Sequence, residues 1–270
     1  MSNVILVDRP APFIGRITLN RPEKRNAIDT AMRSALLAAL QSADNDPEVR
    51  VSIIRGAGPC FSSGYDLSRG LMDDPPHHTA PGDGQWARHV TDSWLSLWDL
   101  AKPVIAQIHG YAIAGASELA AGCDLVYVAE DARIGHPVVR VMSPPDFNYH
   151  PWLVGFRNAM ELMLTGDSVS GIDAVEMGFA NRAYPADQLD DRVLEVAGKI
   201  AAISPDLAQL NKRVVHRAME AMGVRTAIRA STELQALAGH QESVQAARAN
   251  ALEAIKGAVD RPDGADDDSG

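Results

Sequence analysis

The sequence contains only two cysteines, Cys60 and Cys123, among 270 residues. Two isolated cysteines form neither a disulfide framework nor the paired spacing of a zinc site. We therefore interpret each cysteine as a small packing residue. The chain also lacks a His-Glu-x-x-His pair, a Gly-x-Gly-x-x-Gly turn after a strand and a Cys-x-x-Cys pair. These absences argue against a metal site, a dinucleotide cofactor and thiol redox chemistry.

Long apolar runs are missing as well. No stretch approaches the roughly 20 apolar residues that a membrane-spanning helix needs. The first residues, Met1–Val4, do not have the pattern of a signal peptide. We therefore expect a soluble, cytoplasmic protein that does not bind a membrane.

Positive charge is in short supply. Lysine and arginine number 25 against 35 aspartate and glutamate residues, which gives a formal net charge of −10. This balance argues against nucleic acid as a partner. Part of the acidic excess lies in residues 257–270, where aspartates alternate with glycine and proline. We predict that this tail is disordered.

What the chain does have is a hydrophobic content of 46%, which is enough for a large core. Apolar runs predict strands at residues 4–7, 14–19, 49–54, 104–108, 125–129 and 179–183. Helical patterns follow Asp29 and cover residues 86–100, and several more helices fill residues 187–256. The order of these segments predicts an α/β core followed by a C-terminal helical region.

The most informative segment is residues 110–119, with the sequence GYAIAGASEL. It follows an apolar strand and begins a helix, and its small residues allow a ligand to approach the main chain closely. The first N–H groups of a helix are unpaired and favour negative charge, so an oxyanion is stabilised there. Glu118 lies one turn beyond Gly115, and its side chain leans back toward the same place. An anion hole and an acid/base group thus fall within one turn.

A second segment, residues 60–67 with the sequence CFSSGYDL, also follows a strand and contains a glycine. Together, four stretches resemble the enoyl-CoA hydratase/isomerase, or crotonase, superfamily over about residues 3–256. They are ITLNRPEKRNAI at 17–28, FSSGYDL at 61–67, KPVIAQIHGYA at 102–112 with Cys123-Asp124, and LMLTG at 162–166 leading to AVEMG at 174–178.

The resemblance implies a crotonase-like spiral of β-β-α turns. In this family the C-terminal helices pack into trimers, which often pair into hexamers. We accordingly expect a spiral core at residues 1–190, a helical region at 191–256 that forms a homotrimer or a dimer of trimers, and the acidic tail at 257–270.

The resemblance also implies a substrate. Crotonase-type enzymes hold an acyl-CoA thioester and polarise its carbonyl with two main-chain N–H groups, which here belong to Tyr65 and Gly115. Coenzyme A is then part of the substrate, and no separate cofactor is expected. Arg21, Lys24 and Arg25 lie where the family contacts the adenosine phosphates. The coenzyme A contacts that the likeness implies are Lys24, Arg25, Ala27, Ser63, Asp66 and Leu67.

Glu118 matches the first of two catalytic carboxylates in enoyl-CoA hydratases. The second should follow a Phe-Gly-x-Pro-like sequence, but here Ile134-Gly-His-Pro137 is followed by Val138, which cannot transfer a proton. Asp146 lies eight residues further on, where dienoyl-CoA isomerases of the family have a catalytic aspartate. Asp146 could equally be the N-cap of a following helix.

The lack of a carboxylate at position 138 has two further interpretations. His136, Tyr149 or His150 could carry the proton, or Glu118 could act alone in a double-bond isomerisation. The default function is an enoyl-CoA hydratase acting on an α,β-unsaturated acyl-CoA. The alternatives are an enoyl- or dienoyl-CoA isomerase that uses Glu118 with Asp146, or an acyl-CoA binder without catalysis. A hydrolase is disfavoured because the Gly-x-Ser-x-Gly pattern is missing.

Overall fold

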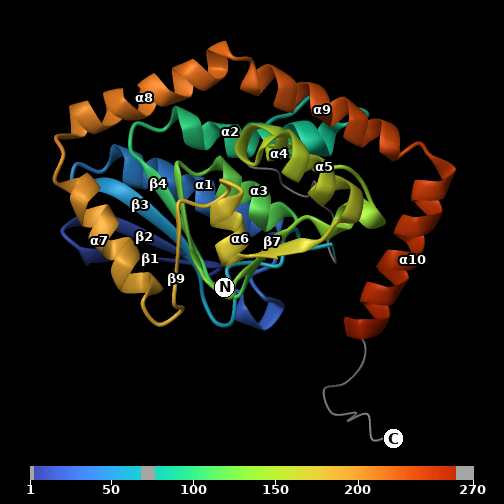
Figure 1. The fold of residues 1–270 in the computed structure, drawn as a ribbon, viewed down its shortest axis with the longest axis horizontal. Coiled ribbons are helices and arrows are strands. Elements are labelled where there is room, and N and C mark those ends of the chain that lie inside the picture. The colour runs from blue at the N-terminus through green and yellow to red at the C-terminus, as the bar shows by residue number, and fades with distance from the viewer. Residues whose placement is uncertain (1–2, 68–76, 260–270) are drawn as a thin grey trace, which may run out of the picture.

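The computed structural model describes residues 3–67 and 77–259, which form two sheets enclosed by helices (Figure 1). The larger sheet has six strands, in the order β1-β2-β3-β4-β6-β9. Only β1 and β2 are antiparallel; every other neighbouring pair in this sheet is parallel. The strands are β1 (Ile5–Ala11), β2 (Phe13–Leu19), β3 (Val49–Gly56), β4 (Val104–Ile108), β6 (Leu125–Ala129) and β9 (Arg182–Tyr184).

All five residues of β4 are buried, and four of them are apolar. Strand β3 carries Arg50, Ser52 and Arg55 but is buried at six of its eight positions. A strand in the middle of a parallel sheet is covered on both faces, which favours a continuous apolar run over an alternating pattern. The same reasoning predicts these strands from the sequence, and the structure confirms them.

A smaller sheet contains β5 (Tyr111–Ile113), β7 (Arg133–Gly135) and β8 (Ser168–Ser170). Strand β5 follows β4 and β7 follows β6, so successive turns of the chain contribute one strand to each sheet. Isolated parallel bridges, Ile28 to Tyr65 and Ser62 to Ala112, bring the loops after β2 and β3 alongside the smaller sheet. Segments that are far apart in the sequence are therefore stacked side by side.

Helices fill the connections between strands. They are α1 (Thr30–Asn45), α2 (Gln85–Asp99), α3 (Gly115–Gly122), α4 (His150–Leu153), α5 (Gly155–Thr165) and α6 (Gly171–Glu176), with 3₁₀ turns η1 (Pro22–Lys24) and η2 (Pro137–Arg140). Asp29 caps α1 by accepting a hydrogen bond from the Met32 N–H, as the sequence predicts. Ser170 and Asp173 form a reciprocal capping box at α6.

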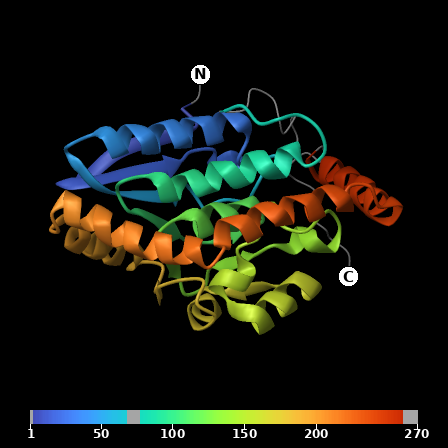
Figure 2. The same ribbon diagram turned by 90° about the horizontal axis from the view of Figure 1, so that it is seen from above.

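Four helices complete the described chain: α7 (Leu189–Ala201), α8 (Pro205–Ala221), α9 (Val224–Ala238) and α10 (Glu242–Val259). Helices α8 and α9 arch over α2, and α10 descends at the edge of the molecule (Figures 1 and 2). Their breaks fall near Pro205, Gly223 and Gly239, which are poor helix formers. None of the described helices is long and apolar enough to cross a membrane.

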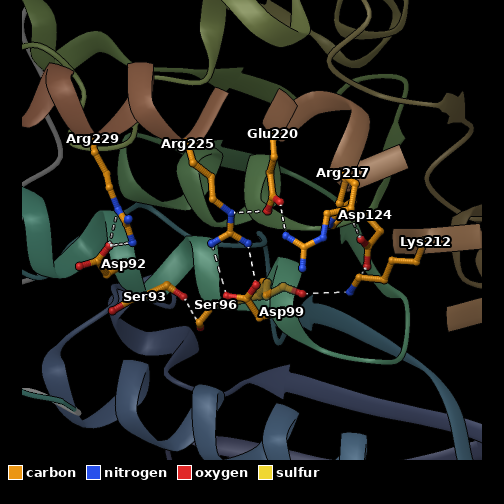
Figure 3. A network of polar contacts seen from close by, with 12 residues as sticks. Asp92, Ser93, Ser96, Asp99, Asp124, Lys212, Arg217, Glu220, Arg225 and Arg229 are labelled. Carbon is orange, nitrogen blue, oxygen red and sulfur yellow. Dashed lines mark hydrogen bonds and ion pairs between the residues drawn. The ribbon is translucent and has the colours of Figure 1, made fainter. Parts of the chain in front are cut away.

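Ion pairs fasten these helices to the core (Figure 3). Arg225 of α9 binds Asp99 of α2 at 2.7 Å. Lys212 of α8 is buried and binds Asp124, at the start of β6, at 2.9 Å, and it also donates to the Leu97 carbonyl. The arch over α2 is thus held by polar contacts as well as by packing.

Some expected boundaries differ. Strand β1, expected at residues 4–7, continues to Ala11, and a strand expected at residues 179–183 lies at Arg182–Tyr184. The helical region, expected to end at 256, continues to Val259. Residues 260–270 of the expected tail, and residues 68–76, lie outside the described residues. Asp146 is not a helix cap, because the next helix begins at His150 with Tyr149 as its N-cap.

Candidate active site

The start of α3 is built from a strained turn. Ala114 has φ +51° and ψ −122°, a backbone conformation that residues with a side chain rarely adopt. Its N–H donates to the Gly135 carbonyl, and its own carbonyl accepts from the Ser117 hydroxyl and N–H. These contacts hold the turn and fix the first N–H of the helix, which belongs to Gly115.

The loop after β3 lies directly against this turn. Gly64 has φ +95°, and a Cβ atom on it would lie 2.6 Å from the Ile113 carbonyl oxygen and 3.2 Å from the Gly115 nitrogen. Only glycine fits such a close approach. Within the described residues, neither the Tyr65 N–H nor the Gly115 N–H donates a hydrogen bond. Two unpaired amides therefore occupy adjacent positions on touching segments.

The Tyr65 side chain crosses the start of α3. A Cβ atom on Gly115 would lie 2.4 Å from two atoms of the Tyr65 ring, so the ring packs flush against this glycine. The Tyr65 hydroxyl donates to Glu118 Oε2 at 2.6 Å and accepts from Trp94 Nε1 at 2.9 Å. Tyr65 thus contributes to the site through its side chain as well as its main chain.

Two buried carboxyl groups, those of Glu118 and Asp146, belong to this site. Glu118 is completely buried, and its Oε1 atom accepts a hydrogen bond from the Asp146 N–H at 3.0 Å. Asp146 is also buried; its Oδ2 atom accepts from Trp86 Nε1 at 3.0 Å, and its carbonyl accepts from the Thr91 hydroxyl. Its other oxygen, Oδ1, has no hydrogen-bond partner within the described residues.

Burial changes the acidity of both groups. Loss of solvent raises the pKa of Asp146 to about 7, although the Trp86 N–H and the nearby Arg33 oppose this shift. The pKa of Glu118 lies well above its ordinary value because of burial and, second, because of the Asp146 charge. Burial thus favours the protonated form of both carboxyl groups, which suits them to acid/base catalysis.

Arg33 of α1 is a buried cation beside this pair. Only 1% of its surface is exposed, and its guanidinium lies 4.9 Å from the centre of the Trp86 ring. Its Nε and Nη2 atoms have no hydrogen-bond partner within the described residues. A buried charge of this kind is costly alone, so the nearby acidic groups and the ring offset part of that cost.

A cavity of about 510 Å³ opens beside the carboxyl pair. Tyr65, Trp86, Val138 and Asp146 are among the residues that line it. Val138, where the second family glutamate was expected, therefore faces the cavity with an aliphatic side chain. Asp146 reaches the same cavity from the following loop.

The other candidate proton carriers are less suitable. His136 lines the cavity, but its Nδ1 lies 3.9 Å from Glu118 Oε1 and burial lowers its pKa to about 4. Burial lowers the pKa of His150 to about 3, and Tyr149 stacks on that ring with 3.9 Å between centroids. Burial also raises the pKa of Tyr149. Both histidines are neutral at pH 7.

The segments expected to contact coenzyme A are joined by main-chain hydrogen bonds. The Ser63 N–H donates to the Arg25 carbonyl, and the Ile28 N–H donates to the Gly64 carbonyl. Ser63 and Leu67 line the cavity. Lys24 and Arg25 are exposed, and Ala27 is partly buried.

Arg21 differs from the expectation. It is buried and forms ion pairs with Asp66 at 2.9 Å and Asp29 at 3.0 Å, and it donates to the Ala27 carbonyl. Its charge is committed to holding the loop, so it is not placed to bind a phosphate. The Asp66 carboxylate is likewise engaged with Arg21, and Lys24 lies 3.9 Å from it.

Sequence reasoning missed the roles of Trp86, Trp94 and Arg33. The two tryptophans are eight residues apart on α2, which places them on one face of the helix. That spacing is visible in the sequence, but their indole N–H partners, Asp146 and Tyr65, depend on contacts between distant segments. The helical pattern indicates core residues, and the tryptophans are also hydrogen-bond donors to the site.

Comparisons with known proteins show which family the chain resembles. The family profile described as Enoyl-CoA hydratase/isomerase matches residues 12–258. A mitochondrial enoyl-CoA hydratase of Pongo abelii is 32% identical over 210 residues, covering 77% of this chain and 70% of the relative. A crystal structure of an enoyl-CoA hydratase from Mycobacterium smegmatis superposes with a TM-score of 0.83 at 31% identity, covering 93% and 90% of the two chains.

A monofunctional enoyl-CoA isomerase from M. smegmatis is also similar, with a TM-score of 0.67 at 29% identity, covering 81% of this chain and 95% of the other. Both activities therefore occur among proteins of this fold. From the profile match and these likenesses, the chain belongs to the enoyl-CoA hydratase/isomerase family of enzymes, within the crotonase superfamily.

Proposed function

We propose that this protein is an enoyl-CoA hydratase, which adds water to an α,β-unsaturated acyl-CoA thioester. The observation that carries the proposal is the buried Glu118–Asp146 pair beside the unpaired amides of Tyr65 and Gly115. A pair of carboxyl groups can take one proton and give another, and the amides can hold the oxyanion that forms between these events.

The thioester oxygen accepts hydrogen bonds from the Tyr65 and Gly115 N–H groups. Asp146, with a pKa near 7, is the base: it removes a proton from water as the water oxygen bonds to Cβ. The electrons of the double bond move onto the thioester oxygen and form an enolate. Glu118, whose pKa burial raises well above its ordinary value, is the acid whose proton ends on Cα. Each amide contributes about 3 kcal/mol to the transition state.

Coenzyme A extends over the loops at residues 24–27 and 63–67. Exposed Lys24 and Arg25 supply positive charge for its phosphates on an otherwise acidic protein. The main chain of Ser62–Asp66 contacts its adenine. Arg21 and Asp66 shape this loop through their ion pair and do not touch the phosphates.

We also propose that the protein assembles as a trimer or a dimer of trimers. Support comes from large apolar side chains on α8 that are more than half exposed, namely Leu207, Leu210, Val214 and Val215. Monomeric proteins rarely expose such a row. Sedimentation velocity should give the mass of three or six chains, and a mass of one chain would contradict the assembly.

The test of the proposed activity uses crotonyl-CoA and longer trans-2-enoyl-CoA esters in water enriched in ¹⁸O. Hydration places ¹⁸O on Cβ, which mass spectrometry detects in the hydroxyacyl product. Glu118→Gln should abolish this incorporation. If the wild-type protein binds these esters but converts none, the protein is an acyl-CoA binder and the proposal fails.

A second candidate, double-bond isomerisation, is favoured by Val138 in the cavity wall. With an aliphatic residue at position 138, the carboxyl groups of the site are those of Glu118 and Asp146. These two groups suffice to move a proton between two carbons without adding water. An isomerase would interconvert 2-enoyl and 3-enoyl esters, or dienoyl esters, and incorporate no ¹⁸O. The same experiment therefore separates the two reactions.

A further inference from the structure

The Tyr65 side chain stands between Glu118 and the cavity. Tyr65 lines the cavity, whereas Glu118 has no exposed surface. The phenol oxygen is 2.6 Å from Glu118 Oε2. The other hydrogen bonds to the Glu118 carboxyl come from the main-chain N–H groups of Asp146 and Phe147. Of these partners, only the phenol can exchange a proton with the carboxyl readily.

Among the described residues that line the cavity, no other side chain is better placed for this role. Val138 has no proton to give. His136 is 3.9 Å from Glu118, beyond hydrogen-bond distance, and it is neutral at pH 7. Asp146 has its own carboxyl group bonded to Trp86. The short contact between Tyr65 and Glu118 is therefore the direct connection between the buried acid and the bound substrate.

We propose that the Tyr65 hydroxyl is a catalytic acid, which passes the proton of Glu118 to the substrate Cα. This role rests on the proposed hydratase function. The enolate electron pair forms the Cα–H bond as the Tyr65 O–H bond breaks. The proton on Glu118 moves to the phenol oxygen, so the tyrosine is restored and Glu118 is left as a carboxylate. The proton that Asp146 took from water later balances this loss through exchange with solvent.

Three features of the site suit this transfer. The Trp94 N–H donates to the phenol oxygen at 2.9 Å, which stabilises negative charge as the proton departs. Burial holds the pKa of Tyr65 well above its ordinary value, so the group is a neutral phenol in the resting enzyme. The ring packs against Gly115, whose amide holds the enolate oxygen, so the donor is close to the carbon that needs the proton.

The same residue would then serve the reaction twice. Its N–H holds the enolate oxygen, and its hydroxyl delivers the proton to the adjacent carbon. The position after Gly64 needs only a main-chain amide for an oxyanion hole, so a tyrosine there is explained by what its side chain does.

The test compares Tyr65→Phe with the wild-type protein and with Tyr127→Phe. Tyr127 is buried on β6 and stacks on Tyr184, away from the cavity residues, so its variant controls for loss of a buried hydroxyl. Tyr65→Phe keeps the amide and the ring. We expect its kcat to fall at least 100-fold with KM changed less than threefold, while Tyr127→Phe keeps its activity. A Tyr65→Phe enzyme within threefold of the wild-type kcat would overturn the relay.

A second measurement separates proton transfer from positioning of Glu118. Replacing Tyr65 with 3,5-difluorotyrosine keeps the hydroxyl and lowers its pKa. The relay predicts that the alkaline limb of the kcat–pH profile moves to lower pH by at least one unit, whereas an unmoved limb would contradict it. Absence of turnover by the wild-type protein would overturn the hydratase proposal and the relay together. Wild-type turnover with an undiminished Tyr65→Phe would overturn the relay alone.

Discussion

The main-chain N–H of Asp146 binds the Oε1 atom of Glu118 at 3.0 Å, so the loop that carries one acid is tied to the side chain of the other. This bond does not involve the Asp146 carboxyl group. A substitution at Asp146 can therefore remove the second acid and leave the position of Glu118 unchanged.

Asp146→Asn should lower kcat by 100- to 10,000-fold, because the variant keeps the Asp146 N–H bond but has no base for water. KM should change little. Steady-state kinetics with an enoyl-CoA ester would measure both. Asp99→Asn, on the exposed side of α2, is the matched control and should be fully active. Equal rates for Asp146→Asn and wild type would remove Asp146 from the mechanism.

The same variant should become more stable than the wild type as pH rises. The folded protein keeps the Asp146 proton up to about pH 7, whereas the unfolded chain releases it near the ordinary value of 3.8. The folded state binds more protons in this window, so wild-type stability falls with rising pH there. Asparagine has no proton to lose.

The unfolding free energy of Asp146→Asn minus that of the wild type should therefore grow from about pH 4 to pH 7. It should level off above pH 7. Its steepest slope is about 1.4 kcal/mol per pH unit. Urea unfolding of both proteins at several pH values measures it. A difference that does not depend on pH would show that Asp146 is ionised throughout.

Val138→Glu should restore activity to Asp146→Asn. Both positions line the same cavity, and position 138 is where the family pattern has its second glutamate. We expect the double variant to recover at least tenfold of the lost kcat, because a carboxylate again faces the bound water. Val138→Gln in the same background controls for side-chain size. Recovery by glutamine as well would exclude an acid/base role for the new side chain.

Gly115→Ala should remove activity while the fold is kept. The added Cβ would meet the Tyr65 ring at 2.4 Å, so the ring must move and both the amide and the phenol are displaced. Loss of one oxyanion donor costs 100- to 1,000-fold in kcat. Gly198→Ala, in α7 with open space around it, is the control. Calorimetry should still detect binding of an acyl-CoA ester to Gly115→Ala.

Lys212→Met should destabilise the fold by about 3–5 kcal/mol, because it removes the buried ammonium group that binds Asp124 and leaves that carboxylate only His216 and the Val104 N–H. Lys199→Met removes an exposed pair with Glu195 and should change the stability much less. Urea denaturation followed by circular dichroism compares the two. Similar losses would mean that the arch over α2 does not depend on the buried pair.

Much of the fold was predictable from the sequence because its signals are local. Apolar runs indicated β3, β4 and β6, and Asp29 marked the start of α1. Boundaries differed where a strand end depends on its neighbour, as in β9, which pairs with β6.

The candidate site was predictable where main-chain geometry follows from a motif, as for Gly115 and the Tyr65 amide. The bond from the Tyr65 hydroxyl to Glu118 spans 53 residues, and no local pattern encodes it. The same holds for Arg21. Its charge indicated a phosphate contact, but it forms ion pairs with Asp29, eight residues further on, and with Asp66, 45 residues away.

The parallel β-bridges between Ile28 and Tyr65 and between Ser62 and Ala112 make the site sensitive to chain length. If a single residue between Gly64 and Gly115 were deleted, the chain before Ala112 would have to compensate for the lost length. Otherwise α3 would shift relative to the loop after β3. Changes in length should therefore be tolerated in the connection before α2 and rejected in the few residues that join β4 to α3.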